Sequence, residues 1–164
     1  MNSTMTPIDW AKRPIQNYVQ FSGRAPRAEY WWYALALIIA TIILSIIESI
    51  LGMKGMIAGV YGPLTLLLAL GTLAPSIAVG IRRLHDTNRS GWWMLLVVPY
   101  LISTVMVMRA MAAGNTAGIG SAGLLGLLGL ACCIALLVFL VLPSNPGDNQ
   151  YGPNPYGDAG GSTA

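Results

Sequence analysis

The sequence predicts an all-α integral membrane protein: a four-helix bundle that spans the membrane, with a short N-terminal interfacial helix and a disordered C-terminal tail. Only 9% of the 164 residues are charged, 55% are hydrophobic, and the mean hydropathy is +0.63. Because soluble domains carry roughly 25% charged residues, this chain has too few charged side chains to cover a water-facing surface. The abundance of apolar residues also excludes a chain that is disordered throughout.

Four apolar runs are long enough to cross a hydrocarbon core, which needs roughly 20 residues per helix. We expect spans at residues 30–51, 62–81, 92–108 and 119–142. The runs are continuous rather than alternating, so helices and not strands are predicted. Pro75 and Pro99 are expected to bend the second and third spans and to free the carbonyls of Gly71 and Leu95.

The Lys and Arg residues predict which side of the membrane each segment occupies. Cytoplasmic segments of membrane proteins carry an excess of these residues. The first and third loops hold one cation each, Lys54 and Arg109. The other seven lie before the first span or between the second and third, namely Lys12, Arg13, Arg24, Arg27, Arg82, Arg83 and Arg89. We therefore expect a multi-pass membrane protein with both termini in the cytoplasm.

Two segments flank the predicted spans. Residues 1–29 lack the apolar core of a signal peptide. Pro14 is expected to open a short helix, with Ile15, Tyr18 and Val19 on one face, so that residues 10–21 lie along the lipid headgroups. Residues 143–164 are rich in Pro, Gly and Asn and contain no Lys or Arg, which predicts a solvated cytoplasmic extension.

Charged side chains gather where the spans are expected to meet the cytoplasm. We expect a polar loop at 82–89 to pair with Glu29 and with the N-terminal arginines, since charges near a low-dielectric interface pair or reach toward water. The same arginines could instead bind an anionic lipid headgroup or a membrane partner. The candidate cluster comprises Arg24, Arg27, Glu29, Arg82, Arg83, His85, Asp86 and Arg89.

Catalytic, metal and cofactor sites have little support in the sequence. His85 beside Asp86 suggests a lipid-modifying enzyme as an alternative, but adjacent residues rarely orient as an acid and its base. One histidine and the neighbouring Cys132 and Cys133 do not supply the spaced ligands of a metal site. No cofactor is expected. The net charge of +3 is accounted for by orientation in the bilayer, so nucleic acid is not an expected partner.

Glycines open the predicted fourth span with dinucleotide-site spacing, G-x-G-x-x-G at 118–123. No strand precedes them and no acidic residue lies about 20 residues on, so this function is not predicted. Gly118, Ala122 and Gly126 are instead spaced by four, which predicts close helix packing, either within the chain or in a homo-oligomer or with a membrane partner.

Polar side chains form two stripes within the spans, one at Thr41, Ser45 and Glu48 and the other at Thr65, Thr72 and Ser76. We expect the stripes to face each other. They either pack or line the path of an oligomeric channel or a small-solute transporter, which is the alternative function. No Asp, Glu, Lys or His lies near a predicted midplane, which argues against an ion-coupled carrier.

Three segments carry a family resemblance: FSGRAPRAEYWW at 21–32, RRLHDTNRSGWW at 82–93 and NPGDNQYGPNP at 145–155. Together, in this order, they resemble the domain of unknown function 805 family of small bacterial inner membrane proteins. The resemblance implies a bacterial inner membrane protein with no established enzymatic activity. We expect a non-enzymatic membrane scaffold or a lipid-binding or partner-binding component. The family's motif positions fall on Gly23, Arg24, Arg27, Glu29, Arg82, Arg83, Leu84, His85, Asp86, Arg89 and Gly91.

Overall fold

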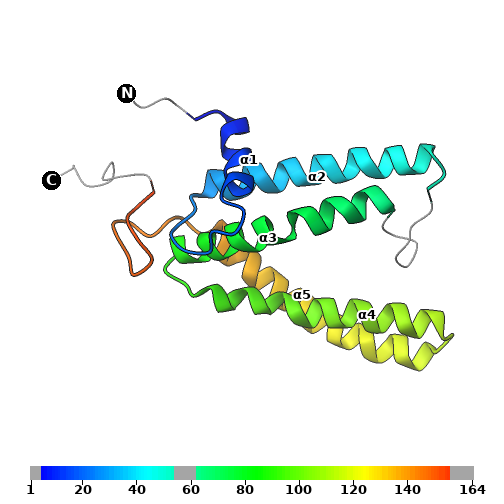
Figure 1. Ribbon diagram of the computed structural model, residues 1–164. Helices are drawn as coiled ribbons and strands as arrows, with labels where there is room; N and C mark the ends of the chain where they lie inside the picture. Colours follow the sequence, from blue (N-terminus) through cyan, green and yellow to red (C-terminus); the bar gives the residue numbers. More distant parts are fainter. Residues whose placement is uncertain (1–4, 54–61, 156–164) are drawn as a thin grey trace.

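The computed structural model describes residues 5–53 and 62–155, and their regular secondary structure is helical (Figure 1). The elements in order are α1 (Pro7–Gln16), α2 (Arg27–Ile50), α3 (Pro63–Asp86), the 3-10 helix η1 (Gly91–Val97), α4 (Val98–Ala112) and α5 (Thr116–Val141). Four segments are long and apolar enough to cross a membrane: α2, α3, η1 together with α4, and α5. The predicted all-α class with four spans is confirmed. Lys54 and residues 156–164 of the predicted tail lie outside the described residues.

The four spans form two antiparallel pairs. Helix α2 packs on α3 and α4 packs on α5, while η1 joins the pairs by contacting both α3 and α5. In Figure 1 the pairs come together at the end where α1 lies, called here the α1 end, and diverge toward the turn between α4 and α5. Side chains such as Ile42, Leu70 and Leu127 are more than half exposed, which fits helices whose apolar faces contact lipid.

The third helix continues further than predicted. We expected residues 82–89 to form a polar loop, but α3 runs to Asp86. A helix C-terminus favours positive side chains, and Arg83 in the last turn also pairs with Asp86 three residues later. The helix ends where Asn88 adopts a left-handed conformation with φ of 58°. The charged motif is therefore held on a helix.

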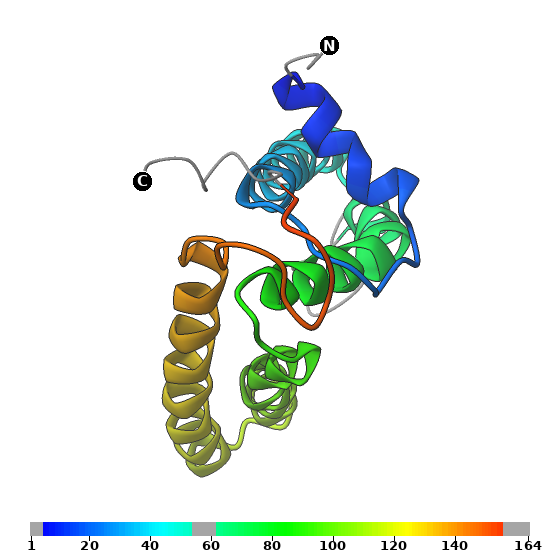
Figure 2. The same ribbon diagram turned by 90° about the vertical axis from the view of Figure 1, so that its left-hand side faces the viewer.

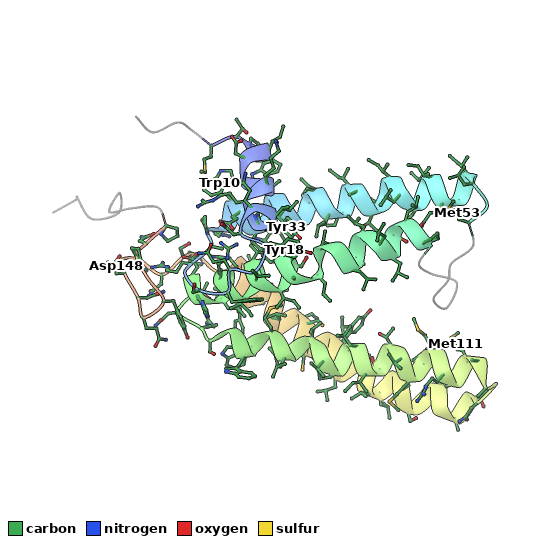
Figure 3. The ribbon with its side chains drawn as sticks, viewed as in Figure 1. Trp10, Tyr18, Tyr33, Met53, Met111 and Asp148 are labelled. Carbon is green, nitrogen blue, oxygen red and sulfur yellow. The ribbon has the colours of Figure 1, made fainter. Side chains whose placement is uncertain are left out.

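The two prolines act differently. Pro75 lies inside α3, and the Gly71 carbonyl four residues earlier accepts a hydrogen bond from the Tyr18 hydroxyl. The Tyr33 hydroxyl lies 3.4 Å from the adjacent Thr72 carbonyl, and Figure 3 shows the two tyrosines close together beside α3. Pro99 instead lies in the first turn of α4, where a backbone N–H group has no partner within the helix and its absence breaks no hydrogen bond. At this position the 3-10 helix η1 gives way to α4, in place of the expected bend.

The N-terminal helix begins earlier than predicted. Pro14 does not open it but lies buried inside α1. The Thr6 hydroxyl oxygen accepts from the Asp9 amide, and the Asp9 carboxylate accepts from the Thr6 amide. This reciprocal capping box fixes the start of the helix, which a proline alone does not do. In Figures 1 and 2, α1 runs across the start of α2 rather than along it. A short N-terminal helix is thus present, and Ile15 on it is 54% exposed.

Candidate functional site

Asp86 is the centre of a buried network at the α1 end. Its side chain is fully buried, and one carboxylate oxygen accepts from Arg24 Nε at 3.0 Å. The other oxygen accepts from Arg83 and from the Ser144 hydroxyl. These partners come from the loop before α2, from the last turn of α3 and from the segment after α5. One carboxylate therefore ties together parts of the chain that are far apart in sequence.

The two guanidinium groups use their remaining donors on backbone carbonyls. Arg24 donates at 2.7 Å to each of two carbonyls in the segment after α5, those of Asn145 and Gly147. Arg83 Nε donates at 3.0 Å to the Leu140 carbonyl, and another of its nitrogens donates to that of Leu142. Arg83 thus supplies donors to the carbonyls at the end of α5, which no residue of that helix can satisfy. Both arginines have protein acceptors and are buried, so they are not free to bind a headgroup.

A second ion pair lies beside the first. Arg82 and Glu29 are 3% and 1% exposed, and their charged groups approach to 2.8 Å. Neither oxygen of Glu29 accepts a hydrogen bond of good geometry from the described residues, so the contact is chiefly electrostatic. Arg13 of α1 approaches the same carboxylate at 3.8 Å. Glu29 with these two arginines therefore joins α1, α2 and α3.

His85 is held apart from Asp86. Its Nδ1 lies 3.1 Å from the Gly23 carbonyl, and its ring stacks on Tyr151 with 3.9 Å between the ring centroids. The Asn149 side chain donates to the His85 carbonyl at 2.9 Å. Because Asp86 is occupied by two arginines, the two residues do not form the acid–base pair of the enzyme alternative.

Six of the eight predicted cluster residues are brought together, and two are not. Arg27 is exposed and takes no part in the network formed by the described residues. Arg89 places its guanidinium over the Phe139 ring at 4.3 Å, a cation–π contact with α5. The six that lie together are Arg24, Glu29, Arg82, Arg83, His85 and Asp86.

The described part of the tail differs from a solvated extension. Residues 143–155 form no helix, yet they follow the surface of the α1 end (Figure 1). Besides the contacts of Ser144 and Tyr151, the Asn145 amide donates to the Asp86 carbonyl at 2.9 Å. The composition of this segment predicted a solvated extension, because the segment has few apolar residues. Its backbone carbonyls are nevertheless the acceptors that the buried Arg24 needs. These tail residues are absent from the predicted cluster.

Among the described residues, the two predicted polar stripes are hydrogen-bonded to each other at one point. Glu48 is buried and accepts from the Leu64 and Thr65 amides and the Thr65 hydroxyl, which caps the start of α3. Thr41 is exposed and donates to the Leu37 carbonyl of its own helix. In the part of the chain that the structure describes, this hydrogen-bonded contact is between Glu48 and Thr65, where Glu48 serves helix capping.

The small-residue stripe of α5 contacts α4 of the same chain. Ala122 is fully buried, and a Cβ added at Gly129 would lie 2.6 Å from backbone atoms of Tyr100. A Cβ at Gly118 would lie 3.2 Å from the Ala110 Cβ. The glycines thus let α4 and α5 approach closely within the chain, while Ala122 and Gly126 also line a cavity of about 530 Å³ between these helices.

No group of three or more His, Cys, Asp or Glu side chains able to hold a metal ion occurs in residues 5–53 and 62–155. Cys132 and Cys133 are free thiols within α5. The α1 end is thus built mainly from buried ion pairs and hydrogen bonds.

Comparisons with known proteins agree with this architecture. Residues 18–153 match the model of a family described as "Protein of unknown function (DUF805)". The "Inner membrane protein YhaH" of Escherichia coli (strain K12) is 33% identical over 149 residues, which cover 90% of this chain and 97% of that protein. The "Inner membrane protein YhaI" of the same strain is 38% identical over 111 residues, which cover 68% of this chain and 89% of that protein. No solved structure matches.

Proposed function

The chain belongs to the DUF805 family of inner membrane proteins, and from this premise we propose that it is a non-enzymatic membrane scaffold whose α1 end binds anionic lipid headgroups from the cytoplasmic side. The network around Asp86 supports a scaffold role. Three arginines and two carboxylates are buried there, and such charges are retained only when they are paired. The network around Asp86 and the neighbouring Glu29–Arg82 pair together link α1, α2, α3, the end of α5 and the tail.

The charge distribution of the described residues carries the lipid-binding part of the proposal. Seven cations lie at the α1 end against four carboxylates, Asp9, Glu29, Asp86 and Asp148, which leaves a net charge of +3. At the other end Arg109 is matched by Glu48. Such asymmetry favours a cytoplasmic α1 end, where anionic lipids attract basic segments.

The exposed cations Lys12 and Arg27 are the expected contacts to the headgroups, because Arg24, Arg82 and Arg83 are buried in the network. Lys12 lies on α1 between the exposed side chains of Ile8 and Ile15, which are 64% and 54% exposed. A helix with an exposed apolar surface bordered by a cation is suited to the membrane interface.

Lipid binding is tested by native mass spectrometry of the purified full-length chain with added phosphatidylglycerol or phosphatidylethanolamine, which both carry a hydrogen-bond donor but differ in net charge. The wild type is expected to retain more phosphatidylglycerol, and Lys12→Gln with Arg27→Gln to lose that preference. Arg109→Gln is the matched control, since it removes one cation from the opposite end and should leave the preference intact. Equal retention of the two lipids by the wild type would contradict the proposal.

Sidedness is tested with a reporter fused after the last residue. A fluorescent protein that folds in the cytoplasm should be bright, and alkaline phosphatase at the same position inactive. The opposite pair of results would place the α1 end outside the cytoplasm. The channel alternative predicts solute flux into liposomes that contain the protein, and flux that depends on Thr41 and Ser45 would favour it over the scaffold.

A further inference from the structure

A cavity of about 450 Å³ lies between the last third of α3, η1 and the loop before α2, outside the ion-pair network. This volume lies within the range of about 300–1,000 Å³ found for small-molecule sites. Its walls include Ile77 and Ile81 of α3, Leu95 and Met94 of η1, and Phe21 of the loop. The lining is therefore mostly apolar, and the exceptions are His85 and Ser90.

The polar residues lie at one end of this cavity. Ile77, Ile81 and His85 follow one face of α3 at spacings of four, so the lining changes from apolar to polar toward the α1 end. The wall formed by η1 and its N-cap runs antiparallel to α3. There too the lining is polar at the α1 end, at Ser90, and apolar further along, at Leu95. The gradient runs along the direction in which the helices cross the membrane. A phospholipid in the adjacent leaflet has the same gradient, from acyl chain to headgroup.

The hydrogen bonds of His85 define what the polar end can bind. A carbonyl oxygen only accepts, so the Gly23 contact places the proton of the neutral ring on Nδ1 and leaves Nε2 as an acceptor. Among the hydrogen bonds of the described residues, none involves Nε2. The Ser90 oxygen accepts from the Trp92 amide, and its O–H group can still donate. The cavity therefore offers a neutral acceptor beside a neutral donor.

From this geometry we propose that the cavity binds one phospholipid whose headgroup carries a hydrogen-bond donor, with the acyl chain along Ile77, Ile81 and Leu95 and the headgroup donor on His85 Nε2. The Ser90 hydroxyl donates to an oxygen of the same headgroup. Ammonium and hydroxyl headgroups both supply the donor, whereas a choline headgroup has none. This inference is independent of the proposed function, because it selects the lipid by hydrogen bonding rather than by charge.

The test compares lipids of equal charge and identical acyl chains. Native mass spectrometry of the full-length chain in detergent is titrated with dioleoyl phosphatidylethanolamine or dioleoyl phosphatidylcholine. One phosphatidylethanolamine per chain is expected to bind about fivefold more tightly, the effect of one added hydrogen bond. Dioleoyl phosphatidylglycerol, which donates through its hydroxyls, should bind at least as well. Equal affinity for phosphatidylethanolamine and phosphatidylcholine would overturn the proposal, as would a preference confined to phosphatidylglycerol.

Two pairs of variants locate the bound lipid. His85→Gln retains an acceptor near the position of Nε2 and should keep the preference, whereas His85→Asn retains only a donor near the position of Nδ1 and should lose it. A merely structural role at the Gly23 carbonyl would give the reverse order. Ile77→Trp fills the cavity and should weaken both zwitterionic lipids, while Leu70→Trp, seven residues earlier on the same face but outside the cavity, should weaken neither. Unchanged binding of both lipids by Ile77→Trp would show that the lipid does not bind in this cavity.

Discussion

Replacing Asp86 by Ala removes the one carboxylate that both Arg24 and Arg83 contact. All three side chains are at most 1% exposed, so neither guanidinium can turn to water without opening the α1 end. Removing one partner of a buried ion pair costs about 3–5 kcal/mol, because the other charge stays buried and uncompensated. The carbonyl acceptors of the two arginines remain, which places the expected loss of unfolding free energy near the lower value, about 3 kcal/mol.

The assay is reversible unfolding of the full-length chain in mixed micelles, titrated with a denaturing detergent. Asp148→Ala is the matched control, since it removes an exposed carboxylate from the tail and should change the unfolding free energy by no more than about 0.5 kcal/mol. A double-mutant cycle of Asp86→Ala with Arg24→Ala should give a coupling energy of about 0.5–3 kcal/mol. A loss below about 1 kcal/mol for Asp86→Ala, or no coupling, would refute the network as the element that holds the α1 end together.

Three further changes test other parts of the structure. Glu48→Ala removes the acceptor of two amides at the start of α3 and should lower the unfolding free energy by about 1–2 kcal/mol, measured in the same titration; no loss would show that the cap is dispensable. Gly129→Ala places a Cβ 2.6 Å from the backbone of α4 and should force α4 and α5 apart, seen as weaker protection in hydrogen exchange, while Gly120→Ala meets nothing within 4 Å and serves as the control. The hydrogen bonds from Thr6 hold the pKa of Asp9 below its ordinary value of 3.8, so the cap of α1 is present at neutral pH and is lost only as the pH falls through that lowered value. Amide exchange in α1 should therefore be insensitive to pH between 7 and 5 once the intrinsic rate is corrected, and Asp9→Asn should raise it; an equal rate in the variant would show that the box does not hold the helix.

Apolar composition was sufficient to predict four long apolar helices, since a helix in lipid needs a long run of apolar side chains. The pairing of Glu29 with Arg82 was also accessible, because isolated charges near a membrane interface need partners. The packing of residues 143–155 on the α1 end could not be predicted from the sequence. Arg24 and Arg83 are satisfied there by backbone carbonyls, and every residue carries one, so the sequence contains no signal for these acceptors.

The sequence was less informative about where α1 begins and about where α4 and α5 approach each other most closely. Pro14 was interpreted as a helix start because proline favours the first turn, but the capping box at Thr6 and Asp9 dominates. The spacing of Gly118 and Gly126 predicted close packing in α5, yet the tightest contact with α4 lies at Gly129, where the backbone of Tyr100 is nearest. Spacing of small residues identifies a face, whereas the crossing point depends on how the two helices are oriented.

The dependence of Arg24 on Asn145 and Gly147 has a consequence for biogenesis. These acceptors leave the ribosome more than a hundred residues after the arginine that uses them. At synthesis rates of about 5–20 residues per second, the arginine waits on the order of ten seconds for its last partners. The last hydrogen bonds of Arg24 therefore form only after the segment beyond α5 has been made, and in a chain that stops before that point this guanidinium group can pair with Asp86 but lacks its two carbonyl acceptors.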